Sequence, residues 1–105
     1  MATLTLKTLT CYETEDNWGA DDAYIKINGV TFWGPIKIND NQGRAINKDI
    51  TFTNKVWIEL WDKDDLDPDD HLGTYIAWAS EAGKGEQEAY FNQDDCSYRL
   101  IYEVG

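Results

Sequence analysis

The sequence predicts an all-β fold, an eight-stranded antiparallel β-sandwich that occupies residues 1–105 as a single domain. Three observations support this prediction. Apolar and polar residues alternate with period two in short segments, as in strands that bury one face. Gly, Asn, Asp and Pro separate these segments at the short intervals typical of turns. No long segment shows the 3.6-residue period of a helix, and a chain of this length has room for one core.

The expected strands can be placed one by one from the alternation. The fifth is the clearest, because Val56 and Ile58 point to one face and Trp57 to the other. In the first strand the apolar positions change parity between Leu6 and Leu9, which predicts a β-bulge near Lys7–Thr8. A short helix is expected at Ser80–Gly83. In chain order the expected strands are Thr3–Cys11, Ala23–Asn28, Thr31–Ile38, Asp49–Thr53, Lys55–Trp61, Gly73–Ala79, Gln87–Phe91 and Ser97–Val104.

The net charge restricts the classes of partner. A formal charge of −11 with nine scattered Lys and Arg argues against nucleic acid, because binding phosphates requires a basic surface. No segment has the ~18 consecutive apolar residues of a membrane span. The first residues already alternate like a strand, so we expect no secretion signal.

The acidic residues are unevenly distributed. Eleven of the twenty carboxylates lie in two windows, Glu13–Asp22 and Asp62–Asp70, each between expected strands. Two unit charges ~4 Å apart repel by about 4 kcal/mol at an effective dielectric constant of 20. A hard divalent cation would relieve this repulsion, and Ca²⁺ prefers six to eight oxygen ligands. The two windows therefore predict a calcium site if the fold brings them together.

The spacing within the windows resembles the calcium-dependent C2 domain family. The first window contains Asp16-Asn-Trp-Gly-Ala-Asp-Asp22, followed by Ala-Tyr-Ile-Lys. The second contains Trp-Asp62-x-Asp64, then Asp70 and His-Leu-Gly. In this family one loop carries Asp-x-x-Gly-x-x-Asp-Pro-Tyr-Val-Lys, and a later loop carries Trp/Tyr-Asp-x-Asp with a further Asp six residues on. Ala23 replaces the usual Pro, and the family's Asn-Pro-x-Trp element is missing.

The resemblance implies a type II-like C2 topology with the calcium loops clustered at one end of the sandwich. The three loops at that end would be Tyr12–Asp21, Asn39–Lys48 and Asp62–His71. Two or more Ca²⁺ ions are expected, and backbone carbonyls near Glu15 and Lys63 would supply further oxygens. The side-chain ligands that the resemblance implies are Asp16, Asp22, Asp62, Asp64, Asp70 and, at an optional position, Asp67.

The same topology bears on the two cysteines. It would place the end of the first strand, at Cys11, beside the beginning of the last strand, near Cys96. A disulfide there would stabilise the fold by roughly 2–4 kcal/mol. The alternative is a pair of buried free thiols. A disulfide would favour an extracellular location, and free thiols would favour a cytoplasmic protein peripheral to membranes.

The function implied is calcium-dependent docking on anionic phospholipid membranes. Trp18 and Leu66 fall at the tips of the two acidic loops, where apolar residues of membrane-binding relatives enter the bilayer. Two alternatives remain open, namely a calcium-dependent carbohydrate-binding or adhesion module, and a calcium-stabilised structural or targeting domain of a secreted protein or toxin. We expect no enzymatic activity, because His71 is the sole histidine and lies within an acidic loop. An EF-hand is excluded because Asp67 and Gly73 stand where such a loop needs Gly and Glu.

Overall fold

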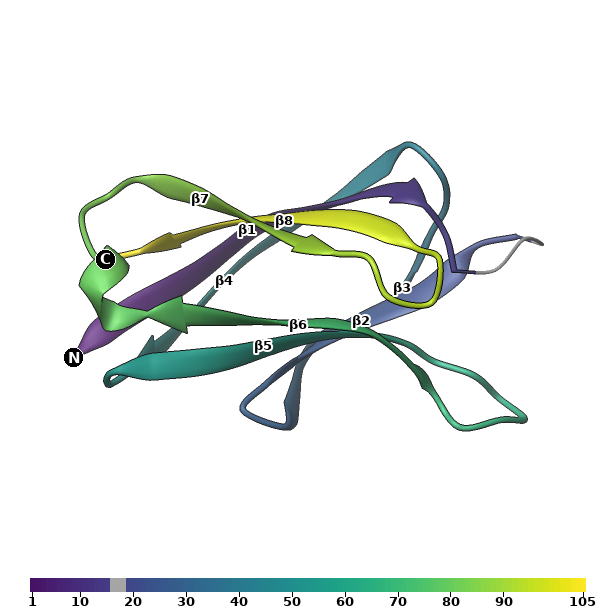
Figure 1. Cartoon of the computed structure of the whole chain (residues 1–105), viewed down its shortest axis with the longest axis horizontal. Helices are drawn as coiled ribbons and strands as arrows, with labels where there is room; N and C mark the ends of the chain where they lie inside the picture. Colours follow the sequence, from purple (N-terminus) through teal and green to yellow (C-terminus); the bar gives the residue numbers. More distant parts are fainter. Residues whose placement is uncertain (16–18) are drawn as a thin grey trace.

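Two four-stranded antiparallel sheets pack face to face in this computed structural model (Figure 1), which describes residues 1–15 and 19–105. One sheet has the strand order β4-β1-β8-β7 and the other β3-β2-β5-β6. The eight-stranded β-sandwich predicted from the sequence is thus confirmed. Within the described residues no helix is long and apolar enough to cross a membrane. The strands are β1 (Ala2–Glu13), β2 (Asp21–Ile27), β3 (Val30–Ile38), β4 (Gln42–Phe52), β5 (Lys55–Asp62), β6 (Asp70–Trp78), β7 (Glu86–Phe91) and β8 (Ser97–Val104).

The core lies between the two sheets and is built by the alternation seen in the sequence. In β8 every second residue is buried, and in β5 the same pattern holds from Val56 to Asp62. Strands with one buried face need this period, because successive side chains point to opposite faces of the sheet. The largest fully buried side chains include Tyr98, Tyr102 and Phe91. Most burial of apolar area, the main driving force for folding, therefore comes from the inner faces of the two sheets.

A β-bulge interrupts β1 where the parity of its apolar residues changes. The pairing of β1 with both neighbours shifts between Leu6 and Thr8, as predicted. The fourth strand differs from the prediction, because β4 begins at Gln42 and not at Asp49. The expected loop Asn39–Lys48 is therefore reduced to a tight turn before β4. The first part of β4 could not be recognised from the sequence, because most residues of this edge strand are exposed and polar and show no apolar alternation.

The chain ends meet at the end of the sandwich opposite the long β5–β6 loop (Figure 1). Thr3 and Gly105 exchange two backbone hydrogen bonds of 2.8 Å, which extend the β1–β8 pairing to the terminus. The expected short helix is present as a 3₁₀ turn, η1 (Ala79–Glu81). Tyr102 Oη donates a hydrogen bond of 2.6 Å to Glu81, which holds this turn against β8.

The two cysteines are buried free thiols, so the disulfide between Cys11 and Cys96 is not formed. The register explains this outcome, because the residue opposite Cys11 is Tyr98 and not Cys96. Cys96 lies in the turn before β8, where its Sγ is 3.6 Å from the carbonyl oxygen of Phe91. Burial raises the pKa of the Cys11 thiol to about 11 and that of Cys96 to about 12.

Candidate metal centre

Acidic side chains from the β1–β2 segment and the β5–β6 loop converge at the end of the sandwich away from the chain termini. The β1–β2 segment contributes Glu15 and, at the first residue of β2, Asp21. The β5–β6 loop and its flanking strand ends contribute Asp62, Asp64 and Asp70. These segments meet because β2 pairs with β5 in one sheet, which places the start of β2 beside the end of β5. The two acidic windows, about forty residues apart in the sequence, are thereby joined.

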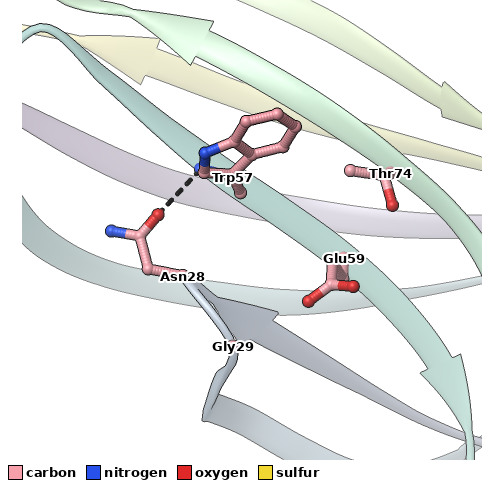
Figure 2. Close-up of a pocket in the computed structure, with 5 residues that line it drawn as sticks. All are labelled: Asn28, Gly29, Trp57, Glu59 and Thr74. Atoms are coloured by element: carbon pink, nitrogen blue, oxygen red, sulfur yellow. Dashed lines mark hydrogen bonds between the residues drawn. The ribbon is translucent and has the colours of Figure 1, made fainter.

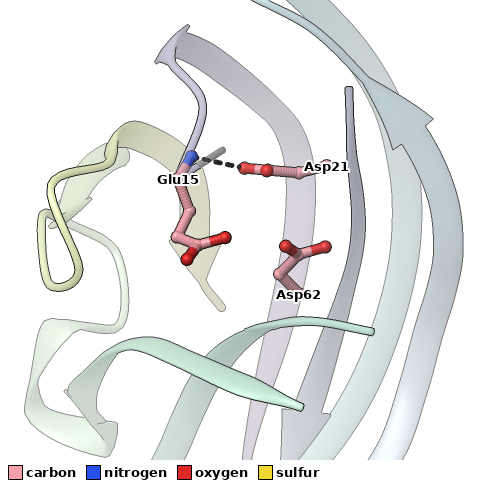
Figure 3. Close-up of side chains that lie close together, drawn as sticks. All are labelled: Glu15, Asp21 and Asp62. Carbon is pink, nitrogen blue, oxygen red and sulfur yellow. Dashed lines mark hydrogen bonds between the residues drawn. The ribbon is translucent and has the colours of Figure 1, made fainter. Parts of the chain in front are cut away.

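The innermost group consists of Glu15, Asp21 and Asp62, whose carboxylates face one another (Figure 3). One oxygen from each lies within 4.8 Å of the others. Asp21 is fully buried and Asp62 is 2% exposed. Asp21 accepts hydrogen bonds from the Glu15 backbone N–H at 3.0 Å and from the Tyr98 hydroxyl. Burying two carboxylates beside a third costs free energy, which hydrogen bonds such as those to Asp21 offset in part and a bound cation would reduce further.

Two further groups share members with the first and extend the site outward. Asp62, Asp64 and Asp70 form one, and Glu15, Asp70 and Asp94 form the other, again with ligand atoms within 4.8 Å. Asp94 comes from the turn between β7 and β8. Because Asp62, Asp70 and Glu15 each belong to two groups, the carboxylates form one connected cluster. Such sharing is what bridging ligands between two neighbouring ions require.

Burial and the close packing of the carboxylates raise the pKa of two members of the cluster, Asp62 and Asp70. Burial, with the nearby carboxylates of Asp21 and Asp64, raises the pKa of Asp62 to about 6. The Asp22 backbone N–H opposes this shift by donating a 2.8 Å hydrogen bond to Asp62 Oδ1. Burial and the adjacent Asp64 also raise the pKa of Asp70. Near pH 6 the Asp62 carboxyl is thus partly protonated, and a divalent cation bound there would displace that proton.

Asp69 shapes the β5–β6 loop without belonging to the cluster. Its carboxylate accepts a hydrogen bond from the Tyr24 hydroxyl through Oδ2 and one of 3.0 Å from the Asp64 backbone N–H through Oδ1. These hydrogen bonds lower the pKa of Asp69, so that it stays ionised. On the other side, Asp40 Oδ1 accepts a hydrogen bond of 2.9 Å from the Thr14 backbone N–H. Both carboxylates thus hold loop backbone in place beside the potential ligands.

The structure brings some of the predicted ligand residues close together and not others. Asp62, Asp64 and Asp70 come together as expected, and Glu15 contributes its carboxylate where only its carbonyl was expected. Asp67 is exposed and belongs to none of the groups found among the described residues. The Lys63 backbone N–H bonds to the Asp22 carbonyl at 2.9 Å, and Leu66 is 98% exposed. Asp16 and Trp18 lie outside the described residues.

Asp21 lies in the cluster where the sequence prediction placed Asp22. In β2 the inward parity is that of Asp21, Ala23 and Ile25, so Asp22 points outward. The carboxylate of Asp22 lies 3.5 Å from Lys37 Nζ on the neighbouring strand. The inward parity of Ala23 and Ile25 was visible in the sequence and could have identified Asp21.

Asp94 was also not among the ligands predicted from the sequence. The sequence signal that could have identified it is the pair Asp94-Asp95. These residues lie in a turn that the topology places at the same end of the sandwich as the two acidic windows. Both residues have positive φ values, 53° and 60°, as tight turns built by Asp allow. Chemically, the complete set offers only hard anionic oxygens and no thiolate or imidazole among the groups found in the described residues. That donor set fits Ca²⁺ better than Zn²⁺ or copper.

Comparisons with known proteins identify the fold. No model of a protein family matches the sequence, and a search of curated proteins finds no relative. Among solved structures, one described as the structure of a C2 domain is 18% identical, with a TM-score of 0.64, and the match covers 100% of this chain and 99% of that one. Human GIVD cytosolic phospholipase A2 matches at 16% identity and a TM-score of 0.66 over 98% of this chain.

A structure of the C2A and C2B domains of Extended-Synaptotagmin 2 is 21% identical with a TM-score of 0.61, again over 98% of this chain. This chain corresponds to 15% of the phospholipase chain and 39% of the synaptotagmin chain, so the likeness extends over only part of each. The two antiparallel four-stranded sheets and the acidic loops gathered at one end agree with the resemblance that the aspartate spacing suggested. The chain has the fold of a C2 domain.

Proposed function

We propose that this C2-like module binds two or more Ca²⁺ ions at the acidic end and then docks that end on anionic phospholipid membranes. The connected cluster of Glu15, Asp21, Asp62, Asp64 and Asp70 is the observation that supports the proposal most directly. Its carboxylates are close enough to share ions, and the buried members gain most from a bound cation. Asp94 adds a ligand from a third connection.

The charge balance explains why calcium would be required for docking. The formal charge of −11 repels an anionic membrane, and each ion cancels two charges, so two ions would change it to −7. The cancelled charges lie at the loop end itself. Ions that retain open coordination positions there can accept phosphate oxygens of the lipid. The ions thus serve as a bridge between two negatively charged surfaces.

An exposed apolar side chain at the same end supports a membrane partner. Leu66 is 98% exposed at the tip of the β5–β6 loop, the same loop that contributes Asp64 to the carboxylate cluster. Fully burying a Leu side chain stabilises association by roughly 1.5–3 kcal/mol. In water this side chain is almost fully solvated, whereas at a bilayer it would enter the apolar layer.

Two measurements test the proposal. Calorimetric titration with Ca²⁺ should show two or more binding events in the wild type and a severe loss in Asp62→Asn. Co-sedimentation with phosphatidylserine vesicles should require Ca²⁺ and should weaken in Leu66→Ser. Val30→Ser is the matched control, because Val30 is also apolar and 70% exposed but lies at the β2–β3 turn, away from the loops.

The outcomes separate the alternatives. A flat calcium titration of the wild type would end the proposal at its first step. Calcium binding with no vesicle association would leave a calcium-stabilised domain and refute membrane docking. Equal losses in Leu66→Ser and Val30→Ser would show that the loop tip is not the docking surface. Calcium-dependent binding to polysaccharide instead of vesicles would favour an adhesion module.

A further inference from the structure

A second candidate site lies on the outer face of the β3-β2-β5-β6 sheet (Figure 2). It is a pocket of about 630 Å³, within the ~300–1,000 Å³ typical of small-molecule sites. Its lining residues come from the β2–β3 turn, the middle of β5 and the facing part of β6. They are Asn28, Gly29, Trp57, Glu59 and Thr74. Asn28 follows the end of β2 opposite Asp21, so this pocket is separate from the metal centre.

The turn that forms one wall is fixed to β5. Asn28 and Gly29 have φ values of 50° and 83°, as in the two-residue turns that Asn-Gly favours. Asn28 N–H donates to the Trp57 carbonyl at 3.0 Å, and Asn28 Oδ1 accepts from the Trp57 N–H at 3.0 Å. This reciprocal pair holds the asparagine side chain beside Trp57 (Figure 2). The pocket wall is therefore formed before any ligand binds.

An exposed aromatic surface is the apolar part of the pocket. Trp57 is 44% exposed, although it lies in the middle of a strand whose alternate residues form the core. Lys55 Nζ lies 5.4 Å from the centroid of the Trp57 ring and 5.3 Å from that of Trp78, so it sits between the two indoles. These contacts limit the freedom of the lysine side chain and of both rings. A large rigid aromatic surface facing water is suited to binding a flat apolar ligand face.

The polar groups of the pocket offer both kinds of hydrogen bond. Within the described part of the chain, the Glu59 carboxylate has no hydrogen-bond or ion-pair partner. The Asn28 amide nitrogen likewise donates to no described residue, because only its oxygen is engaged. Thr74 Oγ1 lies 2.8 Å from His71 Nε2 and can still bond outward. A ligand that both donates and accepts around its rim would satisfy these groups.

Local charge favours a neutral ligand. Glu59 faces Lys26 on β2 in the strand register, and Lys55 lies two positions before Trp57 on the same face of β5. A cationic ligand drawn to Trp57 and Glu59 would meet these two lysines, and an anionic ligand would meet the carboxylate. Neither charge gains a net advantage at ordinary ionic strength.

We propose that the pocket beside Trp57 binds a neutral sugar ring, independently of calcium. One face of a pyranose ring consists of C–H groups, which can stack on the Trp57 indole. Its rim carries hydroxyls, which can donate to Glu59 and accept from Asn28. This would give the domain a second binding surface, for a glycan, on the side of the sheet and away from the loops.

Chemical-shift titration of the ¹⁵N-labelled full chain tests the proposal in EGTA, where any calcium-dependent activity is absent. The probes are cellobiose, maltose, lactose and chitobiose. At least one should shift the Trp57 indole resonance together with the Asn28 and Gly29 amides, with about millimolar affinity. Trp57→Ala should weaken that binding at least tenfold, and Glu59→Gln, which keeps the shape of the side chain, should weaken it several-fold.

Trp78→Ala is the matched control, since it removes the other exposed indole next to Lys55 but no pocket residue. It should bind the sugar as the wild type does. The absence of shifts with all four sugars would overturn the proposal. So would equal weakening by Trp57→Ala and Trp78→Ala, or binding of tetramethylammonium in preference to every sugar. Because all arms contain EGTA, none of these outcomes depends on the metal centre.

Discussion

Replacing Asp62 by Asn should stabilise the calcium-free protein and remove most of its response to calcium. Asp62 is 2% exposed, and its pKa is raised from 3.8 to about 6, chiefly by burial. Holding it ionised at pH 7 costs about 1.4 kcal/mol per pKa unit, or about 3 kcal/mol in total. Asn avoids this cost and can still accept the hydrogen bond from the Asp22 backbone N–H.

The net effect is smaller than the full cost, because a neutral oxygen accepts that hydrogen bond more weakly, by about 1 kcal/mol. We therefore expect a gain of roughly 1–3 kcal/mol in EGTA, which raises Tm by about 5–15 °C in a domain of this size. In the wild type, Ca²⁺ at 100 times Kd adds about 2.7 kcal/mol. The variant should gain little, so the two stability curves should approach or cross as calcium is added.

Thermal unfolding followed by circular dichroism, in EGTA and at several Ca²⁺ concentrations, measures both effects. Asp49→Asn is the control, because Asp49 is an exposed carboxylate in the middle of β4 that lies outside the cluster. It should change neither the EGTA value nor the calcium increment. A lower Tm of Asp62→Asn in EGTA at pH 7 would contradict the strain assigned to this carboxylate. An unchanged calcium increment would contradict its role as a ligand.

The same carboxyl group makes the stability of the calcium-free protein depend on pH. The pKa of Asp62 is higher in the folded than in the unfolded state, so its stabilising contribution to the free energy of unfolding is present below about pH 4 and is lost as pH rises through about 6. Urea unfolding in EGTA should show this loss of stability, and excess Ca²⁺ should suppress it. Asp69→Asn weakens the hydrogen bonds to Tyr24 and the Asp64 backbone, and should lower calcium affinity several-fold by calorimetry, although Asp69 is in none of the carboxylate groups found among the described residues. Unchanged affinity would show that the loop needs no such support. Cys11 and Cys96 should react with a thiol reagent only after unfolding, because both are buried with raised pKa values; rapid labelling of the native protein would contradict this.

Much of the fold could be predicted from the sequence, because strands with one buried face leave a period-two pattern. β5 and β8 carry that pattern without interruption, and even the bulge in β1 was visible as a change of parity. β4 could be predicted only in part, since an exposed edge strand needs no apolar alternation. Where side chains are not buried, the sequence therefore carries little information about secondary structure.

The members of the candidate site that lie at the ends of paired strands could be predicted from the sequence. Asp62 and Asp70 flank a hairpin loop, so pairing β5 with β6 brings them opposite one another in any register close to the observed one. Asp94 depends on the β7–β8 turn returning to the same end, which is a property of the whole topology. The choice between Asp21 and Asp22 depends on a single residue of register, and such a shift moves a side chain to the other face.

The hydrogen bonds between Thr3 and Gly105 have a mechanical consequence. β1 and β8 are antiparallel neighbours whose free ends emerge side by side. A force that pulls these ends apart would load the interstrand hydrogen bonds one after another, as in opening a zipper, and would not shear them all at once. Tension applied through the two ends should therefore peel β8 from β1 at low force, whereas tension between one end and the acidic loops would meet far greater resistance.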